Sequence, residues 1–271
     1  MNPSNYCYFN GDLVTYQNVN LHISDLLFQR GFGVFDFFRC RNGNIPWLKD
    51  YQERLFNSLD LSGIKVDLDR GQFESIIHGL LQKNGLVNGA FKVIVTGGYS
   101  ENLESVTGTA NVVILNLNWN KPPEESFEKG VHLVSDRFVR PNPEVKTLYY
   151  FNTLRLQKKL REYGAVDVMF HTNMISETSR ANLFFVKGGH VYTPASDILK
   201  GITRKQVLSM FGEISVEDIE AGRLYDFDEI FLTSTSRDVT PVVSVEGKRI
   251  GNGTPGPVTR EILAAFRANG W

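Results

Sequence analysis

Residues 175–204 read ISETSRANLFFVKGGHVYTPASDILKGITR, and this stretch predicts two strands joined by a tight turn and followed by a helix. The apolar run 183–186 is typical of a buried strand, and Gly188-Gly189 predicts a turn that leads back into residues 190–192. A helix is expected over residues 203–211. Strands that return on themselves, without regular βαβ alternation, favour an α+β fold.

Two parts of this stretch have recognisable chemistry: Glu177 and the segment Gly201-Ile202-Thr203. The first N–H groups of a helix lack internal partners and carry the positive end of the helix dipole, so residues 201–203 suit a phosphate. A carboxylate such as Glu177 can keep a heteroaromatic nitrogen protonated. Each feature also has an ordinary alternative, because the segment could be a simple capped helix start and Glu177 a solvated loop carboxylate.

Lys146 lies upstream, in the segment PEVKTLYY that spans residues 143–150, and is one of thirteen lysines. Its amine can form a Schiff base with an aldehyde and can then move protons once it is released. Nothing in the lysine alone selects it from the other twelve. Its combination with Glu177 and the helix start at Gly201 singles it out.

The composition excludes several classes of protein. The net charge is −1, which leaves no basic field to recruit nucleic acid or an anionic membrane. No apolar run approaches the ~18 residues of a membrane helix, and the start of the chain lacks the pattern of a signal peptide. The two cysteines and five histidines have no ligand spacing, so no metal site is expected. A cytoplasmic protein is the default expectation.

Residues 118–125 are expected to link two domains, because prolines and charged residues there interrupt the apolar pattern. A smaller N-terminal α/β domain is therefore predicted over residues 1–117, and a larger C-terminal α/β domain over residues 126–271.

Two further local elements are predicted. Asn42-Gly43 between the apolar runs 34–39 and 45–47 predicts a β-hairpin, because both turn positions favour a positive φ. A single helix is expected over about residues 147–163, directly after Lys146.

The chain resembles the class IV pyridoxal-phosphate enzymes, which comprise the branched-chain and D-amino-acid aminotransferases and the aminodeoxychorismate lyases. Residues 31–36 (GFGVFD), 177–203 and 231–242 (FLTSTSRDVTPV) carry the resemblance, and the second of these segments is the most specific. The resemblance implies the two-domain α+β fold of the D-amino-acid aminotransferase-like (fold type IV) enzymes. It also implies pyridoxal 5′-phosphate as cofactor and a homodimer.

The resemblance assigns cofactor roles position by position. Lys146 matches the lysine that forms the Schiff base, and Glu177 matches the acid paired with the pyridine nitrogen. Arg54 matches the arginine that grips the phosphate, where a planar fork suits oxyanions. The remaining matches are Ile202 and Thr203 for the phosphate amides, Thr235 for a second phosphate contact and Leu199 for packing on the cofactor ring.

The positions that set substrate choice depart from both aminotransferase patterns. The loop at 97–104 (GGYSENLE) lacks the Arg-x-His pair of the D-amino-acid enzymes, and Phe35 stands where those enzymes have a tyrosine. Lys92 stands where the branched-chain enzymes have an arginine. A substrate carboxylate still needs a cation in a closed site. The candidates are Arg30, Lys92 and Arg180, although an arginine such as Arg180 could equally be a surface or interface ion-pair residue.

The resemblance implies an aminotransferase that moves an amino group between an α-amino acid and a 2-oxo acid by a ping-pong mechanism. The amino acid would be a D-amino acid or a branched-chain L-amino acid. One alternative is a 4-amino-4-deoxychorismate lyase, which releases pyruvate and 4-aminobenzoate with the same lysine and glutamate. Another is a non-catalytic cofactor-binding dimer. Release of pyruvate without an amino acceptor would identify the lyase, and bleaching of the cofactor band by an amino acid would exclude the scaffold.

Overall fold

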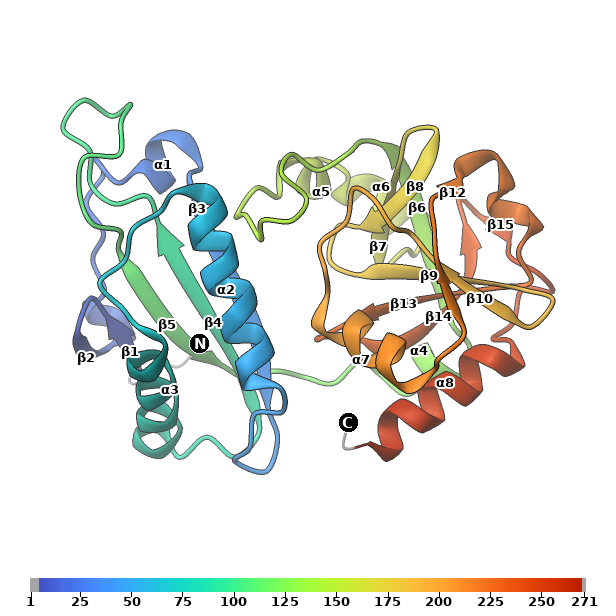
Figure 1. Cartoon of the computed structure of the whole chain (residues 1–271), viewed down its shortest axis with the longest axis horizontal. Coiled ribbons are helices and arrows are strands. Elements are labelled where there is room, and N and C mark those ends of the chain that lie inside the picture. The colour runs from blue at the N-terminus through green and yellow to red at the C-terminus, as the bar shows by residue number, and fades with distance from the viewer. Residues whose placement is uncertain (1–4, 270–271) are drawn as a thin grey trace. The chain divides into compact units, whose positions relative to one another are not determined.

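The computed structural model describes residues 5–269 and divides into two compact units (Figure 1). The first unit holds the chain up to Asn120 and takes in Val145–Tyr149 as well. The second unit holds Lys121–Glu144 and the chain from Tyr150 onward. The segment around Lys146, which the sequence analysis assigned to the second domain, therefore packs within the first unit.

The first unit is built on an antiparallel sheet with the strand order β2-β1-β5-β4-β3. Its strands are β1 (Tyr6–Phe9), β2 (Asp12–Thr15), β3 (Gly33–Cys40), β4 (Gly89–Thr96) and β5 (Val112–Leu117). Its helices are η1 (Tyr16–Asn18), α1 (Leu26–Arg30), α2 (Leu48–Ser62) and α3 (Arg70–Asn84). Figure 1 shows α2 running along the sheet, where it packs against β3. Phe38, Phe73 and Phe91 form the aromatic core under the helices.

The predicted hairpin at Asn42-Gly43 is wrong in its second strand. The turn itself forms, because Arg41 and Asn44 exchange backbone hydrogen bonds of 2.8 and 2.9 Å. However, β3 pairs along its whole length with β4, not with residues 45–47. Pro46 has no N–H to donate to a ladder, and Trp47 adopts φ 57° and starts α2.

The second unit is built on a mixed ten-stranded sheet with the main path β11-β10-β9-β13-β14-β6-β7-β8-β12, while β15 pairs with β14. The strands of its main path are β6 (Val131–Arg137), β7 (Asp167–His171), β8 (Met174–Thr178), β9 (Asn182–Lys187), β10 (His190–Thr193), β11 (Ile214–Val216), β12 (Ile219–Glu220), β13 (Glu229–Ser234) and β14 (Asp238–Val245), with β15 (Lys248–Arg249) beside them. A further pairing between β8 and β9 closes six strands into a ring, and a single residue pair, Glu177 with Asn182, makes it.

A large apolar cluster fills one side of this sheet and includes Leu183, Phe185, Ile230 and Leu232. The alternate residues of β9 and β13 point to the other side, which α7 and α8 cover. The helices of the unit are α4 (Glu125–Glu128), α5 (Phe151–Arg155), α6 (Gln157–Glu162), α7 (Ile202–Met210), η2 (Ala221–Asp226) and α8 (Pro257–Ala268). Within residues 5–269, no helix is long and apolar enough to cross a bilayer.

The single helix expected over residues 147–163 is also wrong. Two short helices, α5 and α6, meet at Leu156, and the residues before them are not helical. Residues 145–149 lie against β3 instead: Thr147 forms an isolated bridge with Val34, the Phe35 N–H donates to the Lys146 carbonyl at 2.9 Å, and the Leu148 N–H donates to the Gly33 carbonyl at 3.1 Å. Tertiary pairing overrides the helical spacing of this segment.

Candidate active site

Glu177 carries a buried carboxylate whose two oxygens both accept hydrogen bonds. Oε1 accepts from Arg140 Nε at 2.9 Å, and Oε2 accepts from the Leu199 N–H at 2.9 Å. The Arg140–Glu177 ion pair is nearly closed to solvent, with side-chain exposures of 12% and 6%. An ionised carboxylate has about four acceptor sites, so Glu177 can still accept the N–H of a protonated pyridine ring. Glu177 is therefore not a solvated loop carboxylate, which was the ordinary alternative for this residue.

Asn182, which pairs with Glu177, fixes the chain just before α7. Its Nδ2 donates to the Leu199 carbonyl at 2.7 Å. A side chain at Gly201 would not fit, because a Cβ there would lie 2.1 Å from Asn182 Oδ1. Glu177, Leu199 and Gly201 thus lie together around Asn182, which pairs with Glu177 through the sheet and contacts Leu199 and Gly201 through its side-chain amide.

The start of α7 fits the phosphate of the implied cofactor. Gly201 is its N-cap and makes no side-chain cap, so the backbone N–H groups of Ile202 and Thr203 have no side-chain acceptor from the cap. Both residues are buried. The close approach at Gly201 and these first-turn amides form a cradle for an oxyanion, which is the donor set that a phosphate monoester requires.

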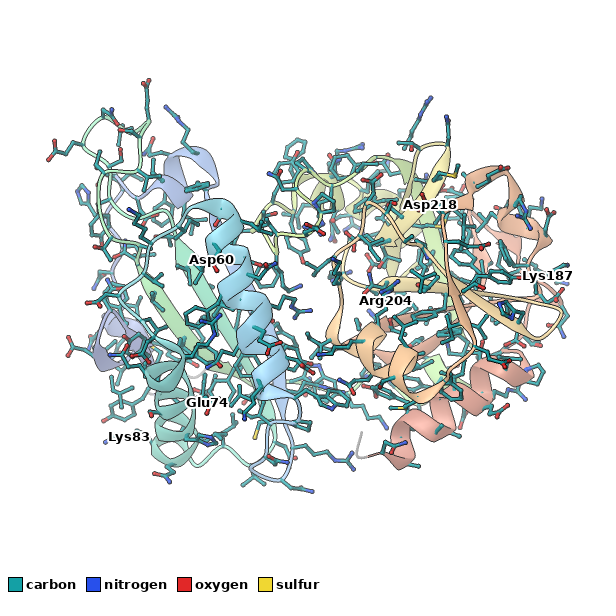
Figure 2. The ribbon with its side chains drawn as sticks, in the orientation of Figure 1. Asp60, Glu74, Lys83, Lys187, Arg204 and Asp218 are labelled. Carbon is teal, nitrogen blue, oxygen red and sulfur yellow. The ribbon has the colours of Figure 1, made fainter. Side chains whose placement is uncertain are left out.

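Arg204 anchors the first turn of α7 to the preceding strand (Figure 2). Its Nε donates to Thr193 Oγ1 at 3.2 Å, and its Nη2 donates to the Pro194 carbonyl at 3.1 Å. Burial lowers the pKa of the Arg204 guanidinium. Arg204 therefore contributes to the position of the cradle through its hydrogen bonds.

Lys146 is held through its backbone in the first unit. Its N–H donates to Ser58 Oγ on α2 at 3.1 Å, and its carbonyl accepts from the Phe35 N–H at 2.9 Å. Its amine lies 4.7 Å from the centre of the Phe35 ring. Lys92 faces the same ring at 5.3 Å, and burial lowers the pKa of its amine. The structure thus brings three of the selected residues together: Phe35, Lys92 and Lys146.

Arg54 makes a buried, bidentate ion pair with Asp36. Arg54 Nε lies 2.9 Å from Asp36 Oδ2, and Nη2 lies 2.7 Å from Oδ1. The Asp36 side chain is fully buried, and that of Arg54 is nearly so. The expected grip on a phosphate stays a prediction, and Asp36 is the group that orients the guanidinium for it.

The two candidate substrate arginines lie nearer the surface of their units. Arg180 is 46% exposed, lies 3.8 Å from Asp167 and donates from Nη2 to the Val166 carbonyl at 3.1 Å. Arg30 ends α1, is exposed and donates to the Gln29 carbonyl. Thr235 lies in the turn between β13 and β14. The roles of Arg30, Arg180 and Thr235 stay predictions.

Sequence reasoning missed four supporting residues: Arg140, Asn182, Asp36 and Tyr150. Burial, together with the negative charge of Asp167, raises the pKa of the Tyr150 hydroxyl to about 12 against the opposing effect of Arg180 and Arg140. Asn182, Asp36 and Tyr150 lie in stretches that the sequence analysis quoted, but without an assigned role, and Arg140 lies outside them. The partners of Arg140, Asp36 and Tyr150 are too far along the chain for local patterns to reveal. Within residues 5–269, no group of three or more His, Cys, Asp or Glu could hold a metal ion.

Comparison with known proteins identifies the class of enzyme that this fold and site define. The model of the family "Amino-transferase class IV" matches residues 33–245, so the chain belongs to that family. It is a pyridoxal-phosphate-dependent aminotransferase, which confirms the expected family, fold class, enzyme type and cofactor.

Individual relatives cover nearly the whole chain. The D-alanine aminotransferase of Bacillus licheniformis is 28% identical over 268 residues, covering 96% of this chain and 95% of the relative. The branched-chain-amino-acid aminotransferase of Escherichia coli K12 is 28% identical over 287 residues, covering 97% and 92%. A crystal structure of the E. coli branched-chain enzyme superposes with a TM-score of 0.89 at 25% identity, covering 98% of this chain and 94% of that one.

Proposed function

We propose that this enzyme transfers an amino group between an α-amino acid, either a D-amino acid or a branched-chain L-amino acid, and a 2-oxo acid in two half-reactions. The observation that supports this most directly is the buried Glu177 carboxylate, which accepts from Arg140 and from the Leu199 N–H. The similarity to both a D-alanine and a branched-chain aminotransferase supports an α-amino acid as the donor.

We propose that seven residues hold the cofactor. Lys146 would bind it covalently through Nζ, Glu177 would pair with its ring nitrogen, and Leu199 would pack on its ring. Its phosphate would contact Arg54, the backbone N–H groups of Ile202 and Thr203, and Thr235. When bound, pyridoxal phosphate supplies an electron sink for the electrons of the substrate Cα–H bond.

The residues of the chain would supply proton transfer and orientation. Lys146 Nζ would take the α-proton from the substrate and deliver it to the cofactor carbon. The main chain of Lys146 is held by hydrogen bonds to Phe35 and Ser58, and its amine lies over the Phe35 ring, so the lysine is presented from a fixed backbone position. Glu177 would keep the pyridine nitrogen protonated, and Arg140 would keep Glu177 ionised.

The substrate carboxylate would bind to one or more of Arg30, Lys92 and Arg180, with Phe35 lining the site. Lys92 supports this role because its amine is half-buried and makes no ion pair with any carboxylate within residues 5–269. A buried cation of this kind is costly unless an anion joins it.

The oligomeric state and compartment belong to the same proposal. We propose that the enzyme works as a homodimer, as the resemblance to its family implies, and that it works in the cytoplasm, which is the default expectation from its sequence. Size-exclusion chromatography with light scattering would give the mass, and a monomer would contradict the first of these statements.

A coupled assay tests the function. The holoenzyme would be given D-alanine, D-glutamate, L-leucine or L-valine with 2-oxoglutarate or pyruvate, while its visible absorption band is recorded. We expect an amino acid alone to bleach the band and an oxo acid to restore it, with turnover for one stereochemical series. If no amino acid bleached the band, the protein would not be an aminotransferase. Pyruvate release from aminodeoxychorismate without an acceptor would identify the lyase instead.

A further inference from the structure

Thr233 on β13 has a buried hydroxyl that makes no hydrogen bond within residues 5–269. The residue is 1% exposed, and its Oγ1 has neither a donor nor an acceptor within reach. Buried polar groups in folded proteins almost always have a partner, and an unpaired one is unfavourable. A hydroxyl of this kind is available to a ligand wherever a ligand-binding feature lies beside it, so its surroundings decide what it can bind.

The sheet register places this hydroxyl beside the start of α7. Thr233 lies directly opposite Asn182 in the antiparallel pair of β13 and β9, and opposed residues project to the same face. The Asn182 amide contacts the chain that leads into α7, at the Leu199 carbonyl and at Gly201. Helix α7 itself packs against β13. Thr233 and the first turn of α7 therefore share one face of the sheet.

The chemistry of the two features is complementary. The first-turn amides of Ile202 and Thr203 are donors without intrahelical acceptors, and the hydroxyl of Thr233 is a further donor without an acceptor. A phosphate dianion offers only acceptors, so it can satisfy all three at once.

We propose that the Thr233 hydroxyl donates a hydrogen bond to the phosphate bound at the start of α7, as a ligand additional to Ile202, Thr203 and Thr235. This proposal rests on the proposed binding of pyridoxal phosphate at that cradle. It gives Thr233 a cofactor-binding role on the face of the sheet that also carries Asn182 and the stacked pair Phe184 and Phe231.

The test uses the apoprotein, with inorganic phosphate and pyridoxal phosphate as separate probes. Thr233→Val keeps the shape of the side chain and removes only the hydroxyl. We expect it to bind either probe roughly tenfold more weakly, because it loses one hydrogen bond to a charged group. The melting temperature of the phosphate-free Thr233→Val protein should stay the same or rise, since a methyl replaces an unsatisfied hydroxyl. Thr233→Ser should keep its affinity within about threefold of the natural protein.

Thr259 offers a matched control. It is fully buried on α8, and its hydroxyl also lacks a partner in the part of the chain that the structure describes. Thr259→Val should leave both affinities unchanged. Equal phosphate binding by Thr233→Val and the natural protein would overturn the proposal, and so would a tenfold loss in Thr233→Ser. If the natural apoprotein bound neither probe, the cradle itself would be wrong, which separates failure of the proposed function from failure of Thr233 alone.

Discussion

Glu177 and Lys146 are the two central groups of the candidate site, and the structure holds them in opposite ways. Both oxygens of Glu177 accept strong hydrogen bonds, from Arg140 and from the backbone of Leu199. Lys146 is fixed by its backbone, while its amine lies over the Phe35 ring in a contact of weak directionality. Glu177 is therefore held through its side chain, whereas the position of Lys146 is set through its main chain.

The largest expected effect is that of Lys146→Ala, which tests the residue that is held through its main chain. Removing the proton-transferring amine should lower kcat by at least about 10³-fold. The free energy of unfolding should change much less, because the hydrogen bonds of the Lys146 main chain to Ser58 and Phe35 remain in the variant. Steady-state kinetics and denaturant titration measure the two effects. Lys158→Ala, at a lysine that is 84% exposed, serves as control and should change neither. Turnover retained in Lys146→Ala would sink the proposed mechanism.

Glu177→Gln tests the residue that is held through its side chain. Both kcat and the free energy of unfolding should fall. The change removes the negative charge that faces Arg140 in a nearly solvent-free ion pair, at a cost of about 3 kcal/mol in the free energy of unfolding. The loss of charge beside the ring nitrogen should lower kcat roughly 100-fold. Glu246→Gln, which weakens an ion pair with Lys159 elsewhere in the unit, should lower stability only. If kcat fell equally in both variants, Glu177 would have no role specific to the cofactor.

Arg180→Ala extends the comparison to the substrate side. We expect KM for the amino acid and the 2-oxo acid to rise roughly tenfold while cofactor content stays full. Arg155 is a matched control, because it is 44% exposed and pairs with Asp136 much as Arg180 lies beside Asp167. Arg155→Ala should leave KM unchanged. Identical kinetics in Arg180→Ala and the natural enzyme would refute its role as an anchor.

The smallest expected effect concerns Lys92, the second amine on the Phe35 ring. Because burial lowers its pKa, the folded protein holds this proton less tightly than the unfolded chain does. The charged amine therefore opposes folding at neutral pH, and this penalty disappears as pH rises through the lowered pKa toward 10.5. Lys92→Met should raise the free energy of unfolding at pH 7 by less than about 1 kcal/mol and make it less dependent on alkaline pH. Urea titrations at pH 7 and 10 measure this, and a loss of stability at pH 7 would contradict it.

The sequence predicted best those elements whose conformation depends on residues only a few positions away. The strands and helix start of residues 175–204 follow from apolar runs, a glycine pair and a glycine N-cap, all read within a few residues. The failures were at positions with distant partners. Residues 145–149 are not helical because they bond to β3, which lies more than a hundred positions earlier in the chain, and no helical spacing reveals that.

The supporting residues of the site follow the same rule. Asn182 could be suspected because it stands in the most specific segment, but Arg140 reaches Glu177 across 37 positions. Asp36 and Arg54 meet only because β3 and α2 pack together. Residue type indicates which contacts and reactions a side chain can make. Only the fold shows which charged group lies beside that side chain.

The single residue pair that closes the six-stranded ring consists of Glu177 and Asn182, which both belong to the candidate site. A seam made by one pair should be among the first places where the ring opens, because local opening follows the fewest cooperative contacts. A ligand that engages Glu177 and the start of α7 binds only the closed form and therefore lowers the population of open rings. Loading with cofactor should consequently slow hydrogen exchange at residues 177–182 more than elsewhere in the sheet, so that this seam reports occupancy of the enzyme.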